Sequence, residues 1–106
     1  MNNNFSEVSV NDIIGTSFYY GYVFNSANEI AKVLDNPIEV YDSKTCFEWR
    51  SKINEIPFAI YDYKNGNLSK NEKIYYHIGT KSPEETKKVV EALKEAGLNA
   101  FVKKLF

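Results

Sequence analysis

The polar side chains that could carry acid–base chemistry lie on strand-like runs in the middle of the chain. They are Glu48, Arg50, Asp62, Lys64 and His77. If neighbouring strands pair, these side chains gather at one end of a sheet, where a carboxylate beside His77 could orient the imidazole for proton transfer. Regular alternation places Asp62 and His77 on opposite faces, so one strand must bulge for them to meet. Cross-strand charge pairs on a solvated face are the simpler interpretation.

Other catalytic arrangements have little support in the residues. A single cysteine, Cys46, and a single histidine cannot form a Cys/His zinc site. No serine stands in a Gly-x-Ser-x-Gly motif, and no glycine-rich phosphate loop is present. A helix start at Ser82 could hold an anion, but Glu84 and Glu85 already neutralise that end. No catalytic residue, metal ligand or cofactor is therefore predicted.

Aromatic residues are the most unusual feature, with 7 Phe, 8 Tyr and one Trp. Most fall on expected strands: Phe18, Tyr19, Tyr20, Tyr22, Phe24, Trp49, Tyr61, Tyr63, Tyr75 and Tyr76. Half should pack beneath helices, and the rest would leave rings and hydroxyls on an open sheet face. Such a face could stack a nucleobase or contact a partner protein. With a few nearby cations (Lys44, Arg50 and Lys64) it would suit a small nucleotide better than a long polyanion.

Two helices are expected to support the strands. The clearer one runs from Pro83 to Ala96, with Ser82 as its N-cap and Gly97 as its stop. Apolar residues recur along it at helical spacing while lysines and glutamates cover the other side. A shorter helix is capped by Asn25 or Ser26 and ends before Pro37.

Strands are expected over Ser17–Phe24, Ile38–Tyr41, Thr45–Ile53, Phe58–Lys64, Lys73–Gly79 and Asn99–Leu105. The three in the middle have short links and form an antiparallel meander. The order of elements predicts an α+β fold, an antiparallel sheet of four to five strands with two helices on one face. A ferredoxin-like topology is one candidate. We expect a flexible N-terminal arm over residues 1–12 and a single domain over residues 13–106.

Length and charge exclude several classes of function. The chain has 106 residues and a net charge of −1, so it offers no broad basic surface for duplex nucleic acid. No run approaches the roughly 18 apolar residues of a membrane span. The start lacks the basic and apolar regions of a signal peptide. A reducing, cytoplasmic setting is expected.

Short motifs are spread over residues 15–95: Gly21-Tyr22, Asn36-Pro37, Glu48-Trp49, Ile60-Tyr61-Asp62-Tyr63-Lys64 and Tyr76-His77-Ile78-Gly79. They resemble a widespread family of small phage-encoded proteins, which has Trp in place of Tyr76 and Gly in place of Thr80. The resemblance implies a phage or prophage origin and a non-enzymatic role against host defences. The motif positions thereby become candidate ligand contacts. The candidate set is Lys44, Glu48, Trp49, Arg50, Tyr61, Asp62, Lys64, Tyr76 and His77.

The last third of the chain has a second resemblance. From Ile74 to Leu105 it runs as strand, Gly turn, helix, Gly and strand, which resembles the second half of a SPOR peptidoglycan-binding domain. That resemblance implies glycan binding. A secretion signal or membrane anchor would be expected with it.

Three functions therefore stay open. The first is a small cytoplasmic phage-type binding protein that inhibits a host antiviral defence system, by blocking a protein or sequestering a nucleotide, without turnover. The second is a nucleotide or phosphodiester hydrolase that uses His77 with Asp62 or Glu48. The third is a SPOR-like glycan-binding domain. A homo-oligomer could form through an exposed strand edge, either Ser17–Phe24 or Ala100–Phe106.

Overall fold

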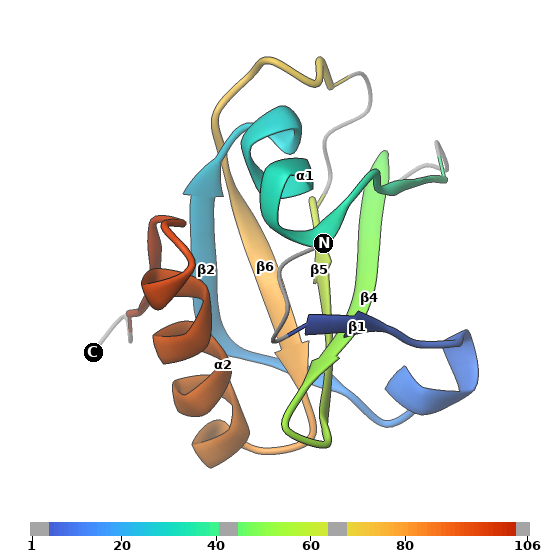
Figure 1. Ribbon diagram of the computed structural model, residues 1–106, viewed down its shortest axis with the longest axis vertical. Helices are drawn as coiled ribbons and strands as arrows, with labels where there is room; N and C mark the ends of the chain where they lie inside the picture. Colours follow the sequence, from blue (N-terminus) through green and yellow to red (C-terminus); the bar gives the residue numbers. More distant parts are fainter. Residues whose placement is uncertain (1–4, 41–44, 64–67, 104–106) are drawn as a thin grey trace.

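The computed structural model describes residues 5–40, 45–63 and 68–103. Within these ranges seven strands form one antiparallel sheet, and two α-helices pack on one of its faces (Figure 1). The strands are β1 (Phe5–Glu7), β2 (Ser17–Asn25), β3 (Ile38–Glu39), β4 (Phe47–Ile53), β5 (Ile56–Tyr61), β6 (Ile74–Thr80) and β7 (Ala100–Val102). The helices are α1 (Ala27–Leu34) and α2 (Pro83–Glu95), and a 3₁₀ helix, η1, spans Val10–Ile13. The predicted α+β class is confirmed.

The strands lie in the order β1-β4-β5-β6-β2-β7, and β3 also pairs with β4. The predicted meander is formed by β4, β5 and β6. Strand β2 lies between β6 and β7 and is antiparallel to both, so β6–α2–β7 is a split β-α-β unit, as a ferredoxin-like sheet also contains. The sheet has more strands than the four to five expected because the short strands β1 and β3 both pair with β4.

Residues 5–13, which overlap the arm predicted over residues 1–12, form β1 and η1. Phe5 is buried in the core and packs edge-to-face on Phe58, with ring centroids 6.0 Å apart. The Val8 amide continues the contact with β4 by donating to the carbonyl of Arg50. One buried phenylalanine thus anchors a segment whose polar composition indicates a loop. Residues 1–4 lie outside the described residues.

Both helices begin where the sequence predicts. The Ser82 side chain accepts a hydrogen bond from the Glu85 amide at 3.2 Å, and Pro83 occupies the first turn of α2. In α1, Ser26 and Glu29 form a complete capping box. After α2, Gly97 adopts a φ of 100°, the left-handed conformation that ends many helices.

The core lies between the helices and the face of the sheet that carries Phe47, Trp49, Ile60, Tyr76 and Ile78. Helix α2 approaches β2 so closely at Gly21 that a Cβ atom there would lie 2.6 Å from Cγ2 of Thr86. Only glycine fits at this crossing. Since α1 and α2 both cover this one face, neither of them covers the other face of the central strands (Figure 1).

Candidate functional site

A row of five side chains crosses the sheet on the face away from the helices. Glu48, Tyr61, His77, Tyr22 and Phe101 stand opposite one another, one from each of β4, β5, β6, β2 and β7. Directly paired residues of antiparallel strands project from the same face. Four of the five carry aromatic rings, so the register alone assembles an aromatic band.

Further rings flank this row and complete what we call the aromatic face, namely Phe18, Tyr22, Phe24, Tyr61, Tyr63, Tyr75, His77 and Phe101. The rings pack on one another, with centroid separations such as 4.5 Å for Phe24–Tyr75 and 5.5 Å for Tyr22–Phe101. Tyr75 is 58% exposed and Tyr63 is 46% exposed. The predicted open, tyrosine-rich sheet surface is thus present.

A bulge in β2 shapes one side of this face. The register against β6 shifts between Phe18 and Gly21, so Tyr19 and Tyr20 form a two-residue insertion. Tyr20 has a φ of 63°, a left-handed conformation that is uncommon for tyrosine. Because two residues are inserted, side-chain alternation is preserved on either side of the bulge. Phe18 and Tyr22 therefore both reach the aromatic face, where their centroids lie 5.3 Å apart.

His77 lies at the centre of the aromatic face. Its ring stacks on Phe18 with centroids 4.0 Å apart and on Tyr63 at 5.3 Å, and meets Tyr22 and Tyr61 edge-on. Burial lowers the pKa of His77 below its ordinary value of 6.5, so the imidazole is neutral at pH 7. The contacts of His77 with described side chains are ring contacts, which makes it a packing centre for the neighbouring rings.

Glu48 and Arg50 lie on the same side of the sheet as Tyr61. The Arg50 Nε donates to a Glu48 carboxylate oxygen at 2.5 Å, so these two predicted site residues neutralise each other. Burial and the Glu48 charge raise the pKa of the Tyr61 hydroxyl, which keeps it protonated. At this end of the face, the charge of Arg50 is therefore already paired with that of Glu48.

Asp62 lies on the opposite, helix-covered face and has no exposed surface. Its carboxylate accepts hydrogen bonds from the amides of Cys46, at 2.9 and 3.0 Å, and Phe47, at 2.8 Å. Asp62 therefore fixes the start of β4 against the end of β5. The proton-transfer pair considered for Asp62 and His77 is not brought together, because the strands keep their regular alternation there.

Trp49 and Tyr76 are also buried beneath the helices. The Trp49 Nε1 donates to the carbonyl of Asp35 at 2.9 Å, which ties β4 to the end of α1. The Tyr76 hydroxyl oxygen is buried without a hydrogen-bond partner among the described residues. Of the nine candidates, Tyr61 and His77 thus lie on the aromatic face and Glu48 and Arg50 beside it. The candidates Lys44 and Lys64 lie outside the described residues.

The structure adds a hollow that the sequence interpretation missed. Tyr22, Tyr75, Phe101 and Lys103 line a shallow depression of about 310 Å³ at the β7 end of the aromatic face. We call it the Tyr75 hollow. Alternation in β2 and β6 is enough to predict that Tyr22 and Tyr75 share a face. The contribution of Phe101 and Lys103 depends on β7 pairing with β2, a contact between distant parts of the chain.

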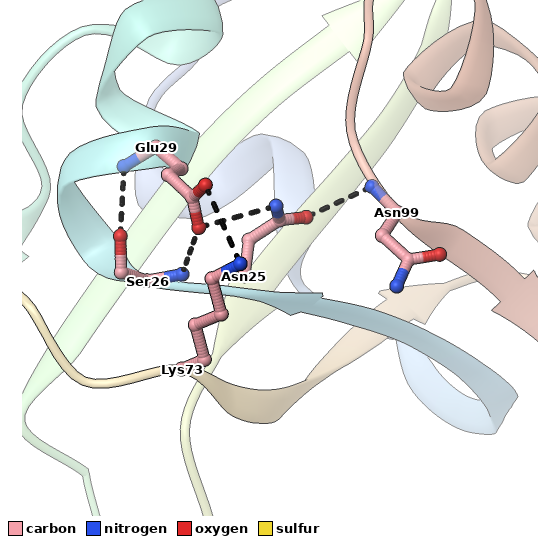
Figure 2. A network of polar contacts seen from close by, with 5 residues as sticks. All are labelled: Asn25, Ser26, Glu29, Lys73 and Asn99. Carbon is pink, nitrogen blue, oxygen red and sulfur yellow. Dashed lines mark hydrogen bonds and ion pairs between the residues drawn. The ribbon is translucent and has the colours of Figure 1, made fainter.

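A polar network holds β7 in place beside β2 (Figure 2). The Asn25 side-chain oxygen accepts from the Asn99 amide at 2.9 Å, and its Nδ2 donates to Glu29 at 3.4 Å. The Glu29 carboxylate also accepts from the Ser26 amide at 2.9 Å, and Lys73 lies 3.9 Å from it. The hydrogen bond from the Ser26 amide lowers the pKa of Glu29 below its ordinary value of 4.5. The network joins the end of β2 and the start of β6 to the starts of α1 and β7.

The comparisons with known proteins do not place the chain in a family. No protein-family model matches it, and searches of curated proteins and of solved structures give no significant match. In the described part of the chain, no helix is long and apolar enough to cross a membrane. The same residues contain no group of three or more His, Cys, Asp or Glu side chains arranged to hold a metal ion.

Proposed function

We propose that this protein is a binding protein that acts through its aromatic face without turning over a substrate. The observation that carries the proposal is the gathering of eight aromatic rings on the side of the sheet opposite α1 and α2. Exposed tyrosines contribute large contact areas at low entropic cost and are enriched in binding hot spots. Pre-packed rings also need little reordering when a partner arrives.

The phage-like motifs give this binding activity a biological setting. We propose that the protein acts in the cytoplasm of a host cell and inhibits an antiviral defence system. It would do so by covering a defence protein or by sequestering a nucleotide signal. Of the motif residues, Tyr61 and His77 support this role from within the aromatic face, whereas Trp49, Asp62 and Tyr76 support it indirectly by building the sheet.

The hydrolase alternative has weaker support. His77 is stacked between Phe18 and Tyr63, Asp62 is on the other face, and Glu48 is paired with Arg50. A general base needs a partner or a substrate proton within hydrogen-bond reach. The SPOR-like alternative is supported by the split β6–α2–β7 unit, and binding to isolated peptidoglycan would favour it over the first proposal.

A phage-plating experiment tests the proposed function. Cells carrying one of a panel of defence systems would express the wild-type protein, a Tyr63→Ala/Tyr75→Ala variant or a Lys88→Ala/Glu95→Ala control from the exposed side of α2. We expect the wild type and the control to restore plating of a restricted phage and the aromatic variant to fail. Equal restoration by all three proteins, or restoration by none against every system, would refute the proposal. Circular dichroism of each variant must show the wild-type fold.

A further inference from the structure

The Tyr75 hollow combines apolar rings with a single positive charge. Tyr22 and Phe101 stack with an interplanar angle of 27°, and Tyr75 meets each of them nearly at right angles, at 6.2 and 6.0 Å. The three rings therefore form two walls of a corner. A flat, electron-rich ring would find one partner for stacking and another for an edge-to-face contact there.

Lys103 supplies the charge at the rim of this corner. Its amide donates to the carbonyl of Tyr20 at 2.9 Å, which fixes the backbone next to the bulge in β2. Its ammonium group forms no ion pair or hydrogen bond with any described side chain. Arg50, at the far end of the aromatic face, is instead paired with Glu48. None of the other lining residues is acidic. An anion would thus find a free cation beside an aromatic corner.

We propose that the Tyr75 hollow binds a nucleoside monophosphate, with the base against Tyr22, Tyr75 and Phe101 and the phosphate at Lys103. The inference rests on the proposed function and narrows its ligand. The volume of about 310 Å³ is at the small end of the range for ligand sites, about 300–1,000 Å³, which fits one nucleotide unit better than a dinucleotide. A lone lysine acts as a point charge for phosphate, which fits one phosphate group better than a chain of them.

The experiment titrates the protein with AMP, adenosine and ribose 5-phosphate and follows amide and side-chain NMR signals. AMP should perturb Tyr22, Tyr75, Phe101 and Lys103 together, and each half-ligand should bind more weakly. Tyr75→Ala should weaken AMP binding about tenfold or more, because a base loses one stacking partner. Tyr75→Phe keeps the ring and should retain most of the affinity.

Lys103→Ala tests the phosphate contact separately. It should weaken AMP binding about three- to fivefold, as expected for a solvent-exposed charge pair, and leave adenosine unaffected. Lys81→Ala, which removes an exposed lysine before α2, is the matched control and should change neither. Absence of AMP-induced shifts at millimolar concentration, or equal affinity in Lys103→Ala, would overturn the inference. If plating still depends on Tyr63 and Tyr75 in that case, the binding function stands and its target is not a nucleotide.

Discussion

Tyr76 carries a buried hydroxyl that has no hydrogen-bond partner among the described residues. Burial and the nearby Asp62 charge raise the pKa of this hydroxyl, so it stays protonated across the physiological range. An unsatisfied buried polar group costs about 1–3 kcal/mol, and exchanging it for an apolar group of the same shape removes that cost. Tyr76 is therefore a structural position in which the ring is needed and the hydroxyl is not.

We predict that Tyr76→Phe raises the free energy of unfolding by about 1 kcal/mol. Urea denaturation followed by tryptophan fluorescence measures the change. Tyr75→Phe, which removes an exposed hydroxyl, is the control and should have little effect. A loss of stability in Tyr76→Phe would contradict this prediction and would mean that the hydroxyl is hydrogen-bonded, for example to a buried water.

His77 should make stability depend on pH. Its pKa is lower in the folded protein than in the unfolded chain, so the unfolded state binds the proton more readily. The stability that the neutral His77 ring contributes is fully present above pH 6.5, and it is lost as the pH falls through the pKa of the folded state. We predict that the wild type loses stability from pH 7 to pH 5 more steeply than His77→Phe, which keeps a ring and cannot titrate. Thermal melts at pH 7 and pH 5 measure the change. An equal fall in Tm for the wild type and His77→Phe would contradict this prediction.

Alternation along the strands was sufficient to predict that Asp62 and His77 face apart, because the period of two depends only on local geometry. The same reasoning could not assign Asp62 its role, since that role comes from the amides of Cys46 and Phe47. Lys103 was missed for a similar reason. Lys103 is a candidate ligand contact only because aromatic rings from other strands lie beside it.

Among the secondary-structure elements, the hairpin between β4 and β5 has backbone strain in its turn. Asn54 and Glu55 form its two-residue turn, with φ values of 48° and 70°. Such turns favour Asn-Gly, because a side chain with a Cβ is disfavoured in the left-handed region. The ion pair of Glu55 with Lys52 is exposed and 3.7 Å long, so it offsets little of this cost.

We predict that Glu55→Gly stabilises the protein by about 0.5–1 kcal/mol. Glu55→Ala is the comparison, since it removes the carboxylate but keeps the Cβ, and it should bring no gain. Chemical denaturation of the three proteins measures the difference. Equal stability of Glu55→Gly and Glu55→Ala would show that the turn is unstrained.

Strand β7 is short, and the network around Asn25 holds its start (Figure 2). Asn25→Ala removes the acceptor for the Asn99 amide and the donor to Glu29. We predict faster hydrogen exchange of the Phe101 and Val102 amides, by about tenfold, with unchanged exchange in β5. The factor corresponds to the ~1.4 kcal/mol expected for one or two lost hydrogen bonds. Uniform acceleration across the sheet would instead indicate global destabilisation.

Both helices could be predicted because capping residues, proline and glycine mark their ends locally. Strand β1 could not be predicted, because it is held in place by one residue, Phe5, which packs against Phe58 of β5. The strand order could not be predicted from the sequence either, because β2 pairs with β6 and β7, which lie far from it in the chain.

For the molecule as a whole, the arrangement of layers gives the protein its candidate function. Seven strands supply two faces, and α1 and α2 cover only one of them (Figure 1). The register of five neighbouring strands then fills the other face with rings. A cluster of exposed aromatic side chains on a small domain is typical of an interaction site.

The most direct test of this account is native mass spectrometry of the protein purified from phage-infected host cells, wild type beside Tyr63→Ala/Tyr75→Ala. We predict that the wild type carries a bound small molecule or a partner protein and that the folded variant does not. A wild-type protein that arrives with nothing bound, or a bound species that persists in the variant, would contradict the claim that the aromatic face is the binding surface.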